Sequence, residues 1–216
     1  MRRTTSGFTL IELLIVISII GLLAAVLLPN ILQGQDAANL LADQTNLRRH
    51  AEWFTSYKSK HNRAVPTQGG HKFVLATWTS GVVEHTEENF DRYFTPGVRD
   101  NNPEYIEKRK SVQRGEDPWP ELRSTNKDDT DYAGRAAAHI RTLEQSAEEA
   151  WMANDNDGIW SHRDGTVNLL LNPATVRTYS HQQLQELFGV GKFDREHPIQ
   201  TWGPNSPIPA CQKLDQ

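Results

Sequence analysis

The chain has 216 residues, which is enough for an apolar N-terminal segment and one globular domain of ordinary size. Its 23 Lys and Arg residues against 27 Asp and Glu residues give a formal charge of −4, and no basic run alternates with aromatic residues. This balance argues against nucleic acid as a partner. Cys211 is the single cysteine, which excludes an intramolecular disulfide; its thiol either pairs with another chain or has no covalent role.

Residues 8–28 form an apolar run that is long enough to cross a membrane as a helix. At ~1.5 Å per residue the run spans ~31 Å, about the thickness of one hydrocarbon core. Arg2 and Arg3 are the only charged residues before it, whereas Asp36 and Asp43 precede the next basic residue, Arg48. The positive-inside rule therefore predicts a single-pass protein of the cytoplasmic (inner) membrane, with a cytoplasmic N-terminus and a periplasmic or extracytoplasmic C-terminal domain.

Three ordinary explanations of this run are weak. A secretory signal has an apolar region of about 7–15 residues before a small-x-small cleavage site, and this run is longer and offers only a poor site. A twin-arginine signal is disfavoured because Arg2 and Arg3 stand at the extreme start without the residues that usually follow. A plain membrane anchor accounts for the length, but it explains neither Gly7 nor Glu12, the single carboxylate of the run.

The sequence GFTLIE at residues 7–12, with the apolar run behind it and Pro29 closing it, resembles the prepilin leader of type IV pilins and type II secretion pseudopilins. The resemblance implies that residues 1–7 are a leader peptide, that a prepilin peptidase cuts between Gly7 and Phe8, and that Phe8 is then N-methylated. It covers the N-terminal segment only.

Cleavage at Gly7 would give Glu12 a physical role. The new amine of Phe8 would lie one helical turn before Glu12, and in a filament the carboxylate of one subunit could pair with the amine of its neighbour. Such a pair in a low-dielectric core sets axial register more than it adds stability. The alternative is a carboxylate that reaches the membrane interface beside its own N-terminus.

A helix break is expected near Gly21 and Pro29, because proline interrupts helical hydrogen bonding and the resemblance implies that this stretch loosens in a filament. Residues 29–62 are then predicted to form an amphipathic stalk helix. Its apolar stripe comprises Leu40, Leu41, Leu47, Ala51, Phe54 and Tyr57, while Asp43, Arg48, Arg49 and Lys58 lie off the stripe.

Residues 63–216 are predicted to form a soluble head domain. Residues 71–81 are a strand or a short helix, 87–94 a short helix, and 95–131 a long irregular loop with one helical turn at 105–112. A strand is expected at 148–155, and a hairpin that turns at Asn172-Pro173 is expected at 166–180. Ser180 is predicted to cap a short helix that ends at Gly189, and the tail after it is predicted to be extended. The resemblance implies an α+β, pilin-like fold: a long N-terminal helix packed on a small antiparallel sheet.

A second resemblance involves DYAGR followed by NDNDGIWSHRDGTVNLLL. These stretches are similar to the C-terminal region of pseudopilin-like proteins of planctomycete-type bacteria, in which a histidine precedes a strand of this kind and a second glycine turn follows. Here NPAT replaces that second turn.

Asp155, Asp157 and Asp164 are the candidate metal ligands, for calcium, because oxygen-rich turns suit that ion and some pseudopilins bind it in a C-terminal loop. The EF-hand pattern fails, since Ala153 stands at its first ligand position, and turn carboxylates that bond their own backbone are the alternative. His162, Asp164 and Ser161 lack a G-x-S-x-G context, so the chain is not expected to be an enzyme, and no other cofactor is expected. Trp119 either contacts a partner or plugs its loop.

The sequence thus predicts a structural subunit of a pilus-like filament, either a type II secretion pseudopilin or a minor type IV pilin, because the paired C-terminal cysteines of adhesive major pilins are missing. The expected partners are the prepilin peptidase, other pilin or pseudopilin subunits, the inner-membrane assembly platform and membrane lipid. The alternatives are an uncleaved, membrane-tethered binding domain and a tethered enzyme.

Overall fold

The computed structural model describes residues 8–143, 146–156, 159–172 and 174–216. The expected leader at 1–7, including Gly7, and the candidate residues Asp157 and Pro173 lie outside the described residues. The chain divides into two units, residues 1–38 and residues 39–216. Helix α1 (Leu10–Lys60) contributes to both of them.

Helix α1 runs for 51 residues without interruption. Gly21 and Pro29 both lie inside the helix, so neither residue interrupts α1 in this structure; the loosening of this stretch in a filament stays a prediction. Proline at position 29 cannot donate to the carbonyl of Ala25, but a single missing bond leaves the hydrogen bonds on either side in place. Helix α1 ends at Lys60, two residues before the predicted end of the stalk at residue 62.

In the second unit, three short helices follow α1. Residues 71–81, which could have been a strand or a helix, contain α2 (His71–Thr79), and α3 (Glu87–Asp91) is the short helix expected from the sequence. The prediction for residues 95–131 was wrong in extent. That segment holds α4 (Pro103–Gln113), capped by the side chain of Asn102, and the 3₁₀ helices η1 (Arg99–Asn101), η2 (Leu122–Ser124) and η3 (Lys127–Asp129).

Five antiparallel strands form one sheet in the order β4-β3-β2-β1-β5. Strands β3 (Val167–Leu171) and β4 (Thr175–Tyr179) are the predicted hairpin, paired residue for residue from Val167–Tyr179 to Leu171–Thr175. Strand β2 (Ala150–Asn154) was also expected from the sequence. Strands β1 (Tyr132–Arg135) and β5 (Leu214–Asp215) were not predicted, and neither were the 3₁₀ helices η4 (Ala137–Thr142) and η5 (Pro209–Cys211).

Helix α5 (His181–Phe188) confirms the predicted caps. Ser180 accepts a hydrogen bond from the backbone of Gln183, whose side chain accepts one from the backbone of Ser180, and Gly189 ends the helix in a left-handed conformation.

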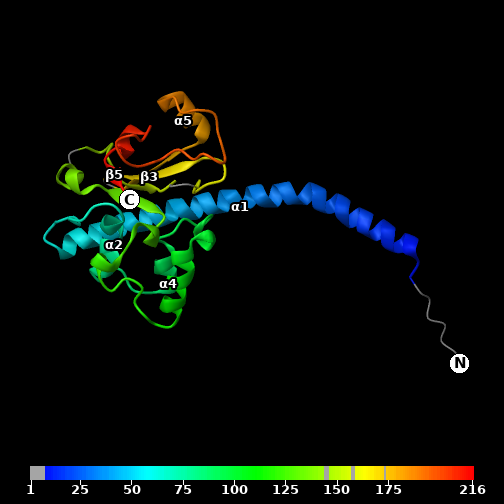
Figure 1. The fold of residues 1–216 in the computed structure, drawn as a ribbon, viewed down its shortest axis with the longest axis horizontal. Coiled ribbons are helices and arrows are strands. Elements are labelled where there is room, and N and C mark those ends of the chain that lie inside the picture. The colour runs from blue at the N-terminus through cyan, green and yellow to red at the C-terminus, as the bar shows by residue number, and fades with distance from the viewer. Residues whose placement is uncertain (1–7, 144–145, 157–158, 173) are drawn as a thin grey trace. The chain divides into compact units, whose positions relative to one another are not determined.

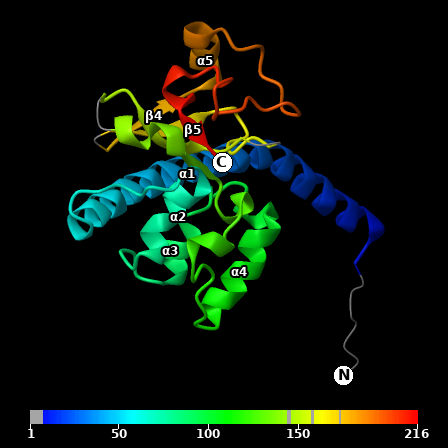
Figure 2. The ribbon, with the colours of Figure 1, turned by 60° about the vertical axis from the view of Figure 1, so that its left-hand side comes forward.

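Two apolar cores lie on opposite faces of the sheet. Within residues 39–216, the C-terminal part of α1 lies between the sheet and helices α2 and α4, and α5 covers the other face of the sheet (Figures 1 and 2). Leu170 of β3 belongs to the core that α1 enters, whereas its neighbours Leu169 and Leu171 belong to the core beneath α5. This alternation is what a strand buried on both faces requires.

Trp119 lies in the first core and is fully buried, so it plugs its loop and is not an exposed contact. Its ring packs against Trp78, Phe90, Tyr93 and Phe94. The fold is thus α+β, with a long N-terminal helix and a small C-terminal antiparallel sheet.

Candidate functional site

Thr9 and Glu12 form a reciprocal cap at the start of α1. One carboxylate oxygen of Glu12, Oε2, accepts hydrogen bonds from the backbone N–H of Thr9 at 2.8 Å and from its hydroxyl at 2.7 Å. The backbone N–H of Glu12 donates to the Thr9 hydroxyl at 3.3 Å. This is a capping box, and its T-x-x-E signature is a signal from which Thr9 could have been identified as the partner of Glu12. It turns the carboxylate toward the N-terminal end of the helix, where the helix dipole favours negative charge.

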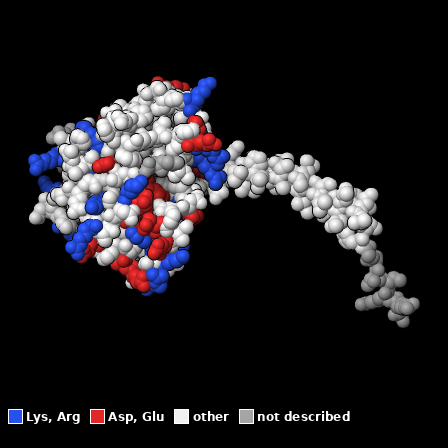
Figure 3. Space-filling view, in the orientation of Figure 1, with Lys and Arg blue, Asp and Glu red and all other residues white. Residues whose placement is uncertain are grey.

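The helix behind this cap is apolar and unburied. Phe8 is 78% exposed and Leu10 is 87% exposed, and the large apolar side chains as far as Leu32 are exposed as well. In Figure 3 this part of the helix is almost free of charged side chains, whereas groups of Lys, Arg, Asp and Glu are scattered over the face of the 39–216 unit turned to the viewer. By length and composition α1 can cross a membrane. An apolar surface of this extent needs lipid or other apolar chains around it.

A second group of polar residues lies inside the 39–216 unit, around Asp43 of α1. The sequence pattern placed Asp43 off the apolar stripe of the helix, but the residue is fully buried. Its Oδ1 accepts a hydrogen bond from the hydroxyl of Tyr132 on β1 at 2.5 Å. Its Oδ2 accepts bonds from Asn154 on β2 at 2.9 Å and from Asn168 on β3 at 2.6 Å. The side chain therefore ties α1 to three successive strands.

His162 completes this group, which we call the Asp43 cluster: Asp43, Tyr132, Asn154, His162 and Asn168. Its Nε2 lies 3.0 Å from Oδ2 of Asp43, and both side chains are buried. Burial alone would raise the pKa of Asp43, but the hydrogen bonds from His162, Asn168 and Tyr132 outweigh it and hold that pKa below its usual value. Burial and the adjacent carboxylate raise the pKa of Tyr132, so its hydroxyl stays a donor.

The stretches DYAGR and NDNDGIWSHRDGTVNLLL, on which the second sequence resemblance depends, contribute residues to the Asp43 cluster. Strand β1 comes from the DYAGR stretch, and β3 comes from VNLLL. His162, the histidine that precedes β3, binds Asp43 and does not contact Asp164 or Ser161 in any hydrogen bond of the described residues. Asp43 could not be identified as the partner of His162 from the sequence, because the two residues are 119 positions apart.

The candidate calcium ligands make bonds within the protein. Asp155 accepts a hydrogen bond from the indole N–H of Trp202 at 2.8 Å and another from the side chain of Gln216. Asp164 accepts one from the backbone of Thr166 at 3.0 Å, which is the local turn bonding that was the alternative to metal binding. Asp157 lies outside the described residues, and the described residues contain no group of three or more His, Cys, Asp or Glu side chains arranged to hold a metal ion.

Comparisons with known proteins agree with the character of the N-terminal helix. The prokaryotic N-terminal methylation motif matches residues 2–28. The chain is 65% identical over 93 residues to the type IV wide pilus major component PilA4 of Thermus thermophilus, a match that covers 41% of this chain and 71% of that protein. No solved structure matches the chain significantly.

The type II secretion system core protein G is also similar to this chain. The protein from Pseudomonas aeruginosa is 35% identical over 69 residues, which cover 32% of this chain and 49% of that protein. The protein from Aeromonas hydrophila is 32% identical over 69 residues, covering 32% of this chain and 48% of that protein. The matches thus span about half the length of each of these two relatives.

A methylation motif, an apolar helix and relatives of these two kinds define a class of membrane-anchored filament proteins. The chain belongs to the family of type IV pilins and type II secretion pseudopilins.

Proposed function

We propose that the chain is a structural, non-catalytic subunit of a pilus-like filament, cleaved between Gly7 and Phe8, N-methylated at Phe8 and assembled through residues 8–28. The observation that carries the proposal is the carboxylate of Glu12, the one charged side chain of residues 8–28, which Thr9 holds at the start of a segment that is otherwise apolar and exposed. A carboxylate in lipid is costly, whereas a carboxylate that meets a cationic amine in a filament core is neutralised.

Thr9 has a definite part in this proposal. It holds Oε2 of Glu12 toward the N-terminus of the helix, which is the direction from which the amine of a neighbouring Phe8 would approach. We expect pairing between subunits to fix the axial offset of one helix against the next, with the energy for assembly supplied by other proteins of an inner-membrane platform.

The membrane topology that goes with this proposal has the leader in the cytoplasm and residues 39–216 on the far side of the inner membrane. Arg2 and Arg3 support that orientation through the positive-inside rule. The filament would be a type II secretion pseudopilus or a type IV pilus in which the chain is a minor subunit. The proposal also includes the division of the mature chain into a transmembrane helix at 8–28, a stalk helix at 29–62 and a head domain at 63–216.

Processing is tested by intact-mass and N-terminal peptide spectrometry of the protein purified from its native membrane. The expected chain begins at Phe8 and carries one added methyl group. A Gly7→Leu variant is the matched control, because it should keep the full leader and still insert. A wild-type chain that begins at Met1 would refute processing and favour the alternative, an uncleaved membrane-tethered binding domain.

Assembly is tested with Glu12→Ala and Thr9→Val, scored by membrane insertion and by filaments recovered after shearing. Both variants should insert, Glu12→Ala should abolish filaments, and Thr9→Val, which keeps the side-chain shape but removes the hydroxyl, should reduce them. Ser18→Ala is the control, since the Ser18 hydroxyl donates to the carbonyl of Leu14 in its own helix at 2.8 Å. Normal filaments from Glu12→Ala would refute the proposed pairing.

A further inference from the structure

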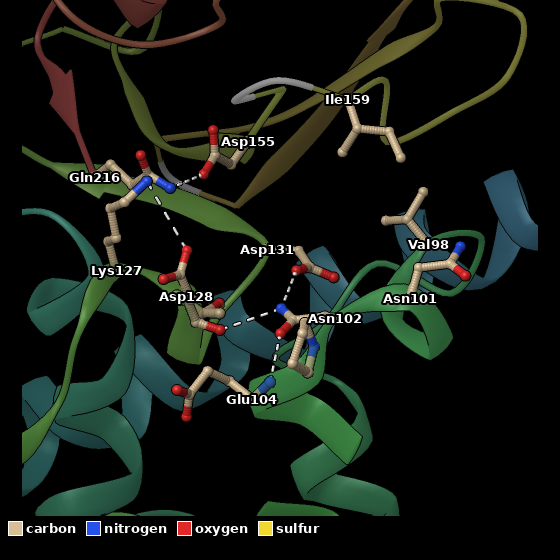
Figure 4. A pocket seen from close by; sticks show the side chains of 12 residues that line it. Val98, Asn101, Asn102, Glu104, Lys127, Asp128, Asp131, Asp155, Ile159 and Gln216 are labelled. Atoms are coloured by element: carbon tan, nitrogen blue, oxygen red, sulfur yellow. Dashed lines mark hydrogen bonds and ion pairs between the residues drawn. The ribbon is translucent and has the colours of Figure 1, made fainter. Parts of the chain in front are cut away.

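Two cavities of the 39–216 unit differ in how their polar groups are bonded. The larger, of about 370 Å³, lies between the turn at residues 95–102, the start of α4, η3 and the residues that follow β2. Its polar walls bond one another, as the side chain of Asn102 donates to Asp131 at 3.0 Å and that of Gln216 donates to Asp155 (Figure 4). In the part of the chain that the structure describes, no residue lining this cavity has a buried side-chain nitrogen or oxygen without a hydrogen-bond partner.

The smaller cavity, of about 60 Å³, lies between α1, the start of β2 and the hairpin of β3 and β4. Phe54 of α1 and Leu170 of β3 form part of its apolar wall, and Lys58 of α1 and Trp151 of β2 also line it. No Asp or Glu is among the described residues that line it. Since the share of one molecule in liquid water is about 30 Å³, this cavity has room for a group of about the size of a carboxylate.

A β-bulge places Trp151 on this side of the sheet. The register between β2 and β3 shifts between Ala150 and Met152, which leaves Trp151 as the extra residue. Trp151 and Met152 both belong to the core that α1 enters, although successive residues of a regular strand face opposite sides. Bulges redirect side chains in this way and are frequent beside functional sites.

The indole N–H of Trp151 lacks an acceptor. The residue is only 7% exposed, and its Nε1 has no hydrogen-bond partner among the described residues. A buried N–H that is left unpaired is costly, and most such groups in proteins are bonded to the protein or to a bound molecule. The ammonium group of Lys58 lies 5.9 Å from the centroid of the same ring. The cavity is thus lined by a donor without an acceptor and by a cation.

We propose that this cavity binds a carboxylate group, which comes either from a small organic acid or from an acidic side chain of a second copy of the chain. A carboxylate only accepts hydrogen bonds, so it complements both the indole N–H and the ammonium group of Lys58. The flexible four-carbon stem of Lys58 is the part of the wall that can move to let the carboxylate reach Nε1. The competing occupant is a water molecule, which would satisfy the N–H without using this charge.

The test follows the indole N–H signals of the full chain in detergent by ¹H–¹⁵N NMR, with Trp151→Phe to assign the Trp151 signal. Propionate is added to the dilute chain in one arm. In the other arm the chain is concentrated without propionate, which separates a free acid from a second copy. The Trp151 signal should shift to saturation in at least one arm. Lys58→Met keeps the stem but removes the charge, and it should weaken the apparent affinity by about tenfold or more.

Trp119 is the internal control, because its indole N–H is also buried without a partner among the described residues but lines neither cavity, and its signal should not move. Lys60→Met is the matched charge control and should respond as the wild type does. The ammonium group of Lys60 donates to the backbone carbonyls of Ser80 and Gly81, away from the cavity.

The absence of a Trp151 shift in both arms would overturn the proposal and favour water as the occupant. An equal response in Lys58→Met, or the same shift with sodium chloride at matched ionic strength, would overturn it as well. If Trp151→Phe fails to fold, the signal is assigned through the contact of the Trp151 ring with that of Phe54, whose centroid lies 5.4 Å away, and the comparison with Lys58→Met decides.

Discussion

Asp43 and His162 lie 119 positions apart in the chain, and their side chains meet at 3.0 Å in the buried space between α1 and the sheet. The contact joins the N-terminal helix to the loop that leads into β3. Around it, Tyr132 donates a hydrogen bond to Oδ1 of Asp43, and Asn154 and Asn168 donate to Oδ2. These donors together stabilise the buried carboxylate, and the loss of any one of them would leave its charge less well compensated.

Replacing Asp43 by Ala should destabilise the protein strongly. The variant would leave His162, Asn154 and Asn168 without their shared acceptor, and breaking a buried pair from one side costs about 3–5 kcal/mol. Urea unfolding of the full chain in detergent, followed by tryptophan fluorescence, measures the change in the free energy of unfolding. Glu52→Ala on the same helix is the control, because its exposed pair with Arg49 should be worth less than about 1 kcal/mol. Equal effects of the two variants would contradict the role of the Asp43 cluster.

The same residue should make the protein sensitive to acid. Since the folded-state pKa of Asp43 is lowered, its contribution to stability is fully present above the unfolded value of about 3.9 and is lost as pH falls through the folded value. The free energy of unfolding of the wild type should therefore decline below about pH 4. Asp43→Asn should reduce the slope of that decline. An unchanged slope would show that other carboxylates cause the acid sensitivity.

Gly134 of β1 should not tolerate a side chain. A Cβ at this position would overlap the carbonyl oxygen of Gly70 and come within 3.0 Å of Val74 of α2. Gly134→Ala should therefore lower the free energy of unfolding by roughly 1–3 kcal/mol, the usual cost of overpacking. Gly191→Ala is the matched control, because nothing lies within 4 Å of its added Cβ. The comparison is made by the same urea titration, and a Gly134→Ala variant as stable as the control would refute the close approach.

The thiol of Cys211 should not react with thiol reagents in the folded protein. It is fully buried, and burial raises the pKa of its thiol, so little thiolate is present to react. A maleimide probe should label it only after denaturation. Ser59→Cys, at an exposed position of α1, is the positive control and should react at once. Rapid labelling of Cys211 in the folded protein would contradict this prediction and would favour the alternative that its thiol pairs with another chain.

The sequence predicted the elements whose signals are local. Ser180 and Gly189 mark both ends of α5, and the alternating apolar residues of β3 with a turn at residue 172 define the hairpin. Strand β1 was missed because YAGR has little strand preference of its own and is extended by pairing with β2 and β5. The extent of α4 was missed because it has no apolar stripe, although Asn102 and Pro103 are a recognisable start.

The candidate site, like the fold, could be predicted from the sequence only where its signals are local. Glu12 stood out as a charge in an apolar run, and its bond partner Thr9 could have been found from the capping-box spacing. Asp43 could not, because a single carboxylate off an apolar stripe normally faces water, and the residues that enclose it come from three strands and a distant loop.

The way Asp43 is bonded has a mechanical consequence. An apolar interface resists separation but allows sliding, because its contacts have no preferred direction. The bonds from Asp43 reach sideways from α1 to β1, β2 and β3 at one level of the helix, so traction along the helix axis would load them together in shear. A helix fastened in this way passes an axial pull to the whole sheet at once, and the 39–216 unit would move with its helix instead of slipping along it.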